Sequence, residues 1–162
     1  MTLALGIDPG TATTGYGLVR LMPDGELVAV DFGVILTPKD ATPSARLVML
    51  FDELNKILKK HKPDTSAVEK LFFSKNVTTG LAVGQARGVI LLALEKAKIP
   101  AYEYTPNEIK QAVAGYGSAE KRQVQEMVRA LLQLKTIPKP DDAADALAVA
   151  ITHLNTARYD SM

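Results

Sequence analysis

The sequence of 162 residues contains no cysteine and only two histidines. The lack of cysteine excludes disulfides, thiolate metal sites and cysteine nucleophiles, and the scarcity of histidine excludes a histidine-rich metal centre. A bound metal would therefore need oxygen ligands, which favours Mg²⁺ or Mn²⁺. No uninterrupted apolar run reaches about 18 residues, and no basic region precedes a long apolar stretch. We therefore expect no membrane span, no signal peptide and no membrane partner.

Length and composition are those of one globular domain. The chain is 47% hydrophobic and 23% charged, which are ordinary values for a soluble fold. At this length a single core suffices without disulfides or structural metals. The sequence contains no repeat and no low-complexity segment, and nothing in it indicates a second domain. We therefore predict a single domain over residues 1–162.

Charge is unevenly distributed along the chain although the net charge is only +1. Residues 1–55 hold three basic and seven acidic side chains, whereas residues 56–88 hold seven and two. Residues 105–139 hold six basic and three acidic side chains, and residues 140–162 hold one and four. The pattern is typical of a carboxylate centre rimmed by positive charge, which suits a polyanionic substrate. Ordinary patchy surface charge explains the same numbers.

Hydrophobic periodicity predicts the order β-β-β-α-β-α-β-α-α-α. Apolar and β-branched runs predict strands, and recurrence at three- and four-residue spacing predicts helices. The first three strands are separated by turn signals and read as an antiparallel meander. Ser118 is a suitable N-cap for the fourth helix. The expected strands cover residues 3–8, 14–21, 27–36, 65–69 and 99–104, and the expected helices begin at residues 43, 76, 106, 118 and 141. Such an order implies an α/β fold with a mixed, five-stranded sheet flanked by helices on both faces.

Two carboxylates stand where predicted strands end. Asp8 follows the first buried strand and Glu69 follows the fourth. Ligands in open α/β sheets collect beyond the carboxyl ends of the strands. If these two strands are parallel neighbours, both acids meet at one edge of the sheet. Alone, Asp8 before Pro9 and Gly10 is equally well explained as a turn residue, and a single Glu69 as a solvated strand end.

The last helix opens with three acids, Asp141, Asp142 and Asp145. Asp142 and Asp145 are three residues apart and share a helical face, and so do Asp141 and Asp145 at a spacing of four. Spacing alone cannot choose between Asp141 and Asp142, although Asp141 suits the N-cap position. The rest of the helix start is small or apolar, so a buried Asp145 is costly unless it is paired or bound to metal.

A cluster of these carboxylates would repel itself and need cations. Two Mg²⁺ or Mn²⁺ ions per site would neutralise it, activate a water molecule and stabilise the leaving 3′-oxygen of a phosphodiester. The residues therefore predict a metal-dependent nuclease whose centre contains Asp8, Glu69, Asp145 and one of the pair Asp141 and Asp142.

At these residues the chain closely resembles the RuvC family of bacterial Holliday-junction resolvases, which have a ribonuclease-H-like fold. The resemblance covers nearly the whole chain through six ordered blocks. They are GIDPG (6–10) with TGYG (14–17), AVE (67–69), the pair Phe72 and Phe73, GQARG (84–88), VAGYGSAEK (113–121) and DAADALA (142–148).

The resemblance implies site assignments that spacing cannot make. Asp8, Glu69, Asp142 and Asp145 fall on the family's metal ligands, although some members carry histidine at the third position. Lys110 and Lys121 fall on catalytic lysines at scissile phosphates. The resemblance further implies DNA contacts, with an aromatic ring that stacks on bases. These expected DNA-binding residues are Phe72, Phe73, Lys75, Asn76, Arg87, Lys110 and Lys121.

The resemblance also implies the activity and its partners. We expect a cytoplasmic bacterial homodimer that resolves four-way DNA junctions by paired symmetric nicks and acts with a RuvA–RuvB branch-migration complex at the nucleoid. The competing interpretations are a phosphotransferase or ATPase of the actin and sugar-kinase group, suggested by DPGT (8–11), and a non-catalytic junction-binding protein. The first would need a second glycine-rich phosphate loop, and the second is disfavoured because all four acids are present.

Overall fold

A computed structural model describes residues 1–10, 12–70 and 77–160, and its elements follow the predicted order. The strands are β1 (Thr2–Asp8), β2 (Thr13–Leu21), β3 (Leu27–Leu36), β4 (Thr65–Glu69) and β5 (Ala101–Tyr104). The helices are α1 (Pro43–His61), α2 (Val77–Lys96), α3 (Pro106–Ala114), α4 (Lys121–Leu131) and α5 (Asp141–Asp160).

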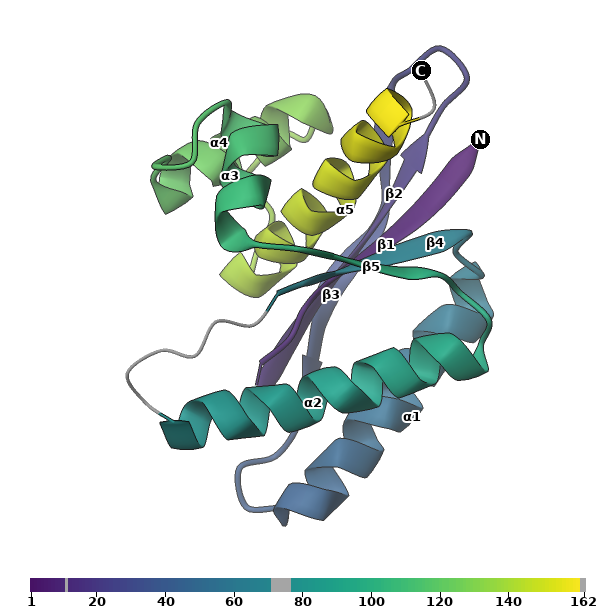
Figure 1. The fold of residues 1–162 in the computed structure, drawn as a ribbon, viewed down its shortest axis with the longest axis vertical. Coiled ribbons are helices and arrows are strands. Elements are labelled where there is room, and N and C mark those ends of the chain that lie inside the picture. The colour runs from purple at the N-terminus through teal and green to yellow at the C-terminus, as the bar shows by residue number, and fades with distance from the viewer. Residues whose placement is uncertain (11, 71–76, 161–162) are drawn as a thin grey trace.

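The strands form one mixed sheet in the order β3-β2-β1-β4-β5 (Figure 1). β1 pairs antiparallel with β2, and β2 with β3, which confirms the predicted meander. β4 pairs parallel with β1, and β5 with β4. The expectation that the first and fourth strands are parallel neighbours is therefore confirmed.

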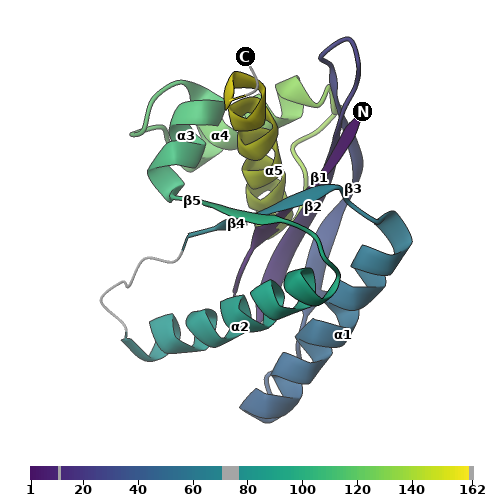
Figure 2. The same cartoon turned by 45° about the vertical axis from the view of Figure 1, so that its right-hand side comes forward.

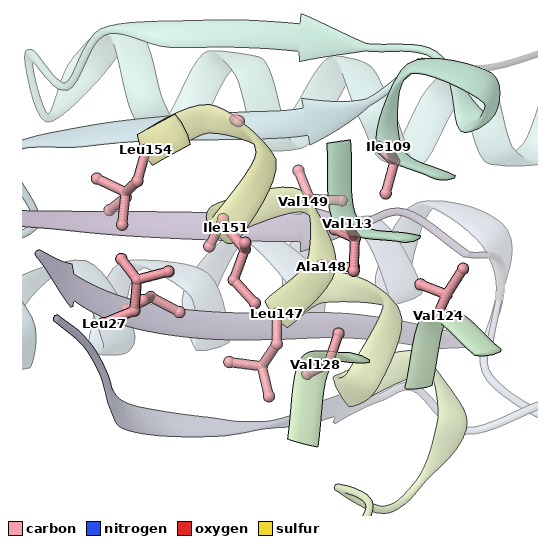
Figure 3. Close-up of a cluster of buried hydrophobic side chains, with 14 of the residues drawn as sticks. Leu27, Ile109, Val113, Val124, Val128, Leu147, Ala148, Val149, Ile151 and Leu154 are labelled. Atoms are coloured by element: carbon pink, nitrogen blue, oxygen red, sulfur yellow. The ribbon is translucent and has the colours of Figure 1, made fainter. Parts of the chain in front are cut away.

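Helices cover both faces of the sheet (Figure 2). α1 and α2 close a core on one face, in which Leu54 and Ile90 are fully buried. α3, α4 and α5 close the core on the other face, where Leu147 and Val128 meet (Figure 3). Burial of one such aliphatic side chain contributes about 1.5–3 kcal/mol to folding. The sheet thus lies between two helical layers and is rigid where its strands end.

Helix α5 lies unusually close to the sheet because glycines face it. A Cβ atom on Gly6 of β1 would lie 2.1 Å from the carbonyl oxygen of Ala146. A Cβ atom on Gly15 of β2 would lie 2.0 Å from the carbonyl oxygen of Asp142. These glycines let the first turns of α5 sit directly over the ends of β1 and β2.

The N-terminal boundary of α4 differs from the prediction. The helix begins at Lys121, and Glu120 is its N-cap in place of Ser118. The backbone N–H of Glu120 donates to the side chain of Gln123 at 2.8 Å. Residues 115–120 instead form the connection from α3, which ends at the left-handed Gly115. The prediction missed this because it rested on the N-cap preference of Ser118 alone, whereas the bond from the Glu120 N–H to Gln123 fixes the helix start two residues later.

By length and composition alone, α2 is apolar enough to cross a membrane, with a mean hydropathy of 1.5 in its best window. The helix contains no uninterrupted apolar run of 18 residues, because polar residues such as Gln85 and Arg87 lie within it. The sequence pattern therefore did not predict this property. In the fold, Ile90 and Leu94 of α2 are fully buried in the core shared with α1. Arg87 also pairs with Glu103 of β5, which ties the helix to the sheet.

Candidate metal centre

Asp8 and Glu69 are the last residues of two adjacent parallel strands. Ile7 is paired with Val68, so the next residue of each strand leaves the sheet at the same edge. The two side chains share a hydrogen bond. Asp8 and Glu69 therefore meet at one edge of the sheet, as predicted for parallel neighbouring strands.

Asp142 and Asp145 reach the same edge from the first turns of α5. One carboxylate oxygen from each of Asp8, Asp142 and Asp145 lies within 4.8 Å of the others. All three side chains are partly buried. Glu69 adjoins this group through its hydrogen bond to Asp8. The choice that spacing left open is decided here, because it is Asp142 that joins Asp8 and Asp145.

Asp141 is the first residue of α5, whereas an N-cap residue precedes the first helical residue. The predicted N-cap role of Asp141 is therefore wrong by one position. Its carboxylate Oδ2 lies 3.7 Å from the Lys121 Nζ atom. The same ammonium lies 3.6 Å from Oδ2 of Asp145. Asp145 thus has a basic partner. The sequence did not indicate this contact, because Lys121 lies far from Asp145 along the chain and on a different helix.

Burial and crowding raise the pKa values of three of these acids, Asp8, Glu69 and Asp145. Burial, with the neighbouring Glu69 carboxylate, raises the pKa of Asp8 to about 9. Burial also raises the pKa of Glu69, despite its hydrogen bond to Asp8 and the charges of Lys110 and Lys121, which lower it. Burial raises the pKa of Asp145 although Lys121 opposes the shift. Such raised values signal an excess of negative charge that a cation would relieve.

The donor set fits a hard divalent cation. Every candidate ligand atom is a carboxylate oxygen, and no sulfur or imidazole belongs to the group found within the described residues. Mg²⁺ and Mn²⁺ prefer such ligands, whereas a zinc site would use histidine or cysteine. The raised pKa of Asp8 is the second observation in favour, because bound metal would replace the retained proton.

Two lysines from neighbouring helices face the carboxylates. Lys110 lies on α3, which Thr105 caps by accepting from the Glu108 N–H at 3.1 Å. The positive charge of Lys110 lowers the pKa of Glu69. Burial lowers the pKa of Lys121, but Asp145 and Asp141 raise it above the ordinary value, so this ammonium stays charged. Both lysines are therefore cationic groups beside the acidic centre.

The remaining predicted DNA contacts are less directly tied to the centre. Phe72, Phe73, Lys75 and Asn76 lie outside the described residues. Arg87 is paired with Glu103, and its side chain is 20% exposed. Its role in DNA binding stays a prediction.

Sequence reasoning missed the close approach of Gly15 to Asp142 and the contact of Lys121 with Asp145. Gly15 allows Asp142 to approach the sheet, and Lys121 links α4 to α5. Gly15 had a signal, since a glycine inside a strand often marks close approach of another backbone. The contact of Lys121 with Asp145 had no signal in the sequence, because 24 residues separate the two and no local pattern joins their helices.

Comparison with known proteins gives concordant matches. The family model described as crossover junction endodeoxyribonuclease RuvC matches residues 4–153. The crossover junction endodeoxyribonuclease RuvC of Chloroflexus aggregans is 60% identical over 154 residues, which are 95% of this chain and 93% of that protein. The corresponding protein of Roseiflexus sp. is 54% identical over 156 residues, or 96% and 92% of the two chains.

Solved structures match over the same extent. Thermus thermophilus RuvC in complex with Holliday junction substrate superposes with a TM-score of 0.94 at 35% identity, covering 99% of this chain and 97% of that one. The yeast mitochondrial Holliday junction resolvase superposes with a TM-score of 0.67 at 16% identity, covering 98% and 86%. The second likeness concerns the fold alone.

Proposed function

The chain belongs to the RuvC family of crossover junction endodeoxyribonucleases, and we propose that Asp8, Glu69, Asp142 and Asp145 are its metal ligands and catalytic carboxylates. It has the ribonuclease-H-like fold of that family. It is a metal-dependent nuclease that resolves four-way DNA junctions in recombination and repair. Membership in this family removes the actin and sugar-kinase alternative.

The observation that carries the site assignment is the convergence of the acids. Carboxylate oxygens of Asp8, Asp142 and Asp145 lie within 4.8 Å of one another, and Glu69 is hydrogen-bonded to Asp8. Two Mg²⁺ or Mn²⁺ ions bound there would supply an activated water and charge stabilisation of the leaving 3′-oxygen. The water oxygen bonds to phosphorus as the bond to the 3′-oxygen breaks, which leaves a 3′-hydroxyl and a 5′-phosphate.

The chain's own groups orient this reaction. The carboxylates at the ends of β1 and β4 and at the start of α5 would hold the ions. Lys121 is within 4 Å of Asp145 and is charged, so it offers a positive group to the scissile phosphate beside the acids. Lys110 plays the same part from α3 next to Glu69. We assign both lysines to the catalytic groups and to DNA binding.

We further propose that the enzyme is a homodimer that packs through α2. Leu81 and Leu92 are 59% and 54% exposed on this helix. The spacing of residues 81, 85, 88 and 92 puts Leu81, Gln85, Gly88 and Leu92 on one face, and all four are exposed. A twofold axis through this face gives two equivalent sites, as paired symmetric nicks require.

The remaining proposals rest on the family resemblance. Phe72 or Phe73 stacks on bases near the junction centre, and base–aromatic stacking contributes about 1–3 kcal/mol per base. Lys75, Asn76 and Arg87 contact the same DNA. The enzyme acts with a RuvA–RuvB branch-migration complex, in the cytoplasm and at the nucleoid.

The function is tested with a labelled four-way junction and an equal-length duplex. We expect symmetric nicking of the junction with Mg²⁺ or Mn²⁺, no cleavage with chelator, and no cleavage by Asp8→Asn. The matched control is Asp40→Asn, which changes an exposed aspartate in the loop before α1. Metal-independent cleavage, or undiminished cleavage by Asp8→Asn, would sink the proposal. Tight junction binding without any cleavage by the wild-type chain would favour the non-catalytic alternative.

A further inference from the structure

Four lysines surround a cavity of about 550 Å³ where the carboxyl ends of α1 and α2 converge. We call this cavity the lysine pocket. Lys59 and Lys62 come from the end of α1, and Lys96 and Lys98 from the end of α2. No aspartate or glutamate is among the residues that line it. The lysine pocket is therefore a concave site of one charge sign, in the size range of ligand and peptide pockets.

The floor of the lysine pocket is apolar. Leu58 and Ile99, which line it, are only 5% and 8% exposed, and the partly buried Phe51 adjoins them. A floor of this kind favours an apolar group, whereas the rim favours negative charge. A ligand that carries both an apolar group and negative charge would satisfy the two preferences together.

The lysine pocket lies at the opposite end of the sheet from the carboxylates. Pro63 lines the pocket just before β4 begins, whereas Glu69 is the last residue of β4. Along α2, 20 residues at about 1.5 Å each separate its two ends by about 30 Å. In Figure 1, α1 and α2 converge at the right, and the carboxyl ends of β1 and β4 point to the left. The basic run that we expected to rim the carboxylates thus contributes Lys59 and Lys62 to another surface.

Favourable interaction with the helix dipoles explains part of this arrangement, since lysine is stabilising near a helix carboxyl end. Lys62 and Lys98 have φ angles of 48° and 59°, the left-handed conformation that is common where a helix ends. The Lys62 N–H accordingly donates to the Leu58 carbonyl oxygen at 2.9 Å and closes α1. No ion pair links any of the four lysines to a carboxylate within residues 1–10, 12–70 and 77–160. Their charges are available to a ligand.

We propose that the lysine pocket docks an acidic segment of another protein, which places one apolar side chain on the floor between Leu58 and Ile99. Carboxylates on either side of that anchor pair with the four lysines. Duplex DNA fits less well, because its phosphate backbone offers no apolar group to the floor. The pocket also lies at the opposite end of β4 from Glu69. A partner bound there leaves the catalytic edge open.

The probe is a fluorescein-labelled peptide of sequence EDELFEDE, measured by anisotropy with the full-length protein at low salt. We expect saturable binding that the double substitution Lys59→Glu and Lys98→Glu weakens at least tenfold. The matched control reverses two exposed lysines elsewhere, Lys39→Glu with Lys135→Glu, and weakens binding less than twofold. A peptide with serines in place of its Leu-Phe pair binds at least fivefold more weakly. Junction cleavage by the Lys59→Glu and Lys98→Glu protein is unchanged.

Three results overturn the proposal. The first is absence of saturable peptide binding. The second is an equal loss of peptide binding in the control protein, which would indicate nonspecific charge attraction. The third is displacement of the peptide by the junction, or a loss of junction affinity in the Lys59→Glu and Lys98→Glu protein, which would make the pocket a phosphate-backbone contact. None of these results bears on the carboxylate centre, so its test stands separately.

Discussion

Gly15 of β2 and Asp142 of α5 are in direct backbone contact, since a Cβ atom on Gly15 would lie 2.0 Å from the Asp142 carbonyl oxygen. Gly15 is also the residue that pairs with Asp8 across the sheet. One glycine thus sets the distance between a strand-end acid and the helix that carries two others. The geometry of the metal centre depends on a residue that has no side chain.

Substitution Gly15→Ala is predicted to separate the acids. The methyl group must displace the first turn of α5, which moves Asp142 and Asp145 away from Asp8. A misplacement of about 1 Å costs about 100-fold in rate, so we expect cleavage of the junction to fall at least that far. Overpacking of this kind lowers the free energy of unfolding by about 1–3 kcal/mol. Junction cleavage kinetics and thermal melting measure the two effects.

Gly117→Ala is the matched control for that change. A Cβ atom on Gly117 would meet only ordinary contacts, the nearest at 3.9 Å. We expect near wild-type cleavage and melting from this protein. Full activity in Gly15→Ala would show that the close approach to Asp142 is not needed.

Metal binding is predicted to release protons near neutral pH. Burial and the Glu69 carboxylate hold the pKa of Asp8 at about 9, so Asp8 keeps its proton at pH 7 until metal displaces it. Apparent metal affinity therefore rises with pH up to about 9. Calorimetric titration with Mn²⁺ in buffers of different ionisation enthalpy measures the protons released. A binding enthalpy that is independent of the buffer would contradict the prediction.

Without metal, the same acid makes stability fall as pH rises. The folded state retains a proton on Asp8 that the unfolded chain loses near pH 4, so the free energy of unfolding decreases between about pH 4 and pH 9. Asp8→Asn, which mimics the protonated acid, should melt higher than the wild type in chelator at pH 8. Mn²⁺ should raise the melting temperature of the wild type and not that of Asp8→Asn. A lower melting temperature for Asp8→Asn in chelator would argue against a protonated Asp8.

Lys121→Gln is predicted to lower turnover far more than junction binding. The ammonium lies 3.6 Å from Asp145 and stays charged, so we expect it to act where charge develops in the reaction. Removal of one such group costs about 100- to 1,000-fold in turnover. The matched control is Arg122→Gln, because Arg122 is adjacent and its side chain is 79% exposed. Equal losses in turnover and affinity would indicate a simple DNA contact.

Leu81→Asp is predicted to convert the dimer to a monomer. The substitution places a charge on the proposed α2 contact face, where 59% of Leu81 is exposed in the single chain. We expect the molar mass in light scattering to halve and paired nicks to become independent single nicks. Val48→Asp on α1 is the control, since Val48 is 58% exposed on another helix. Retention of the dimer by Leu81→Asp would place the contact elsewhere.

Tyr104→Phe is predicted to destabilise the fold through the loss of one buried hydrogen bond. The Tyr104 hydroxyl lies 2.8 Å from Nδ1 of the buried His153, whose Nε2 lies 2.8 Å from the Thr65 hydroxyl. Loss of the hydroxyl leaves a buried nitrogen unsatisfied, at a cost of about 1–3 kcal/mol in the free energy of unfolding. Tyr102→Phe is the control, because Tyr102 contacts His153 through its ring, with centroids 4.6 Å apart. Equal melting of the two variants would count against the hydrogen bond.

His153 also predicts a pH dependence on the acid side. Burial lowers its pKa below the ordinary 6.5, so the folded state takes up its proton at a lower pH than the unfolded chain does. The stability that neutral His153 contributes is therefore complete above about pH 6.5 and is lost as the pH falls below it. His153→Gln should flatten the change in melting temperature between pH 7 and pH 5. An unchanged slope would assign that loss to other groups.

The order of elements and the strand-end acids were predictable because they depend on local patterns. The stripe of Leu50, Leu54 and Leu58 predicts α1, and all three are buried. Asp8 and Glu69 follow short apolar runs, and the rule that parallel strands present their carboxyl ends together predicts that they meet. The start of α4 was not predictable, since Glu120 caps it through a bond to Gln123 that competes with the local preference of Ser118.

The sequence by itself determined the ligand chemistry. With no cysteine and few histidines, only oxygen ligands remain, and the four acids stand in recognisable blocks. Only the tertiary structure decided which acids converge and where the positive charge lies. It joined Lys121 to Asp145, brought a carboxylate oxygen of Asp142 within 4.8 Å of those of Asp8 and Asp145, and carried Lys59 and Lys62 to the opposite end of the sheet. The physical reason is that residue types are local properties, whereas these distances depend on how closely α5 packs on the glycines of β1 and β2.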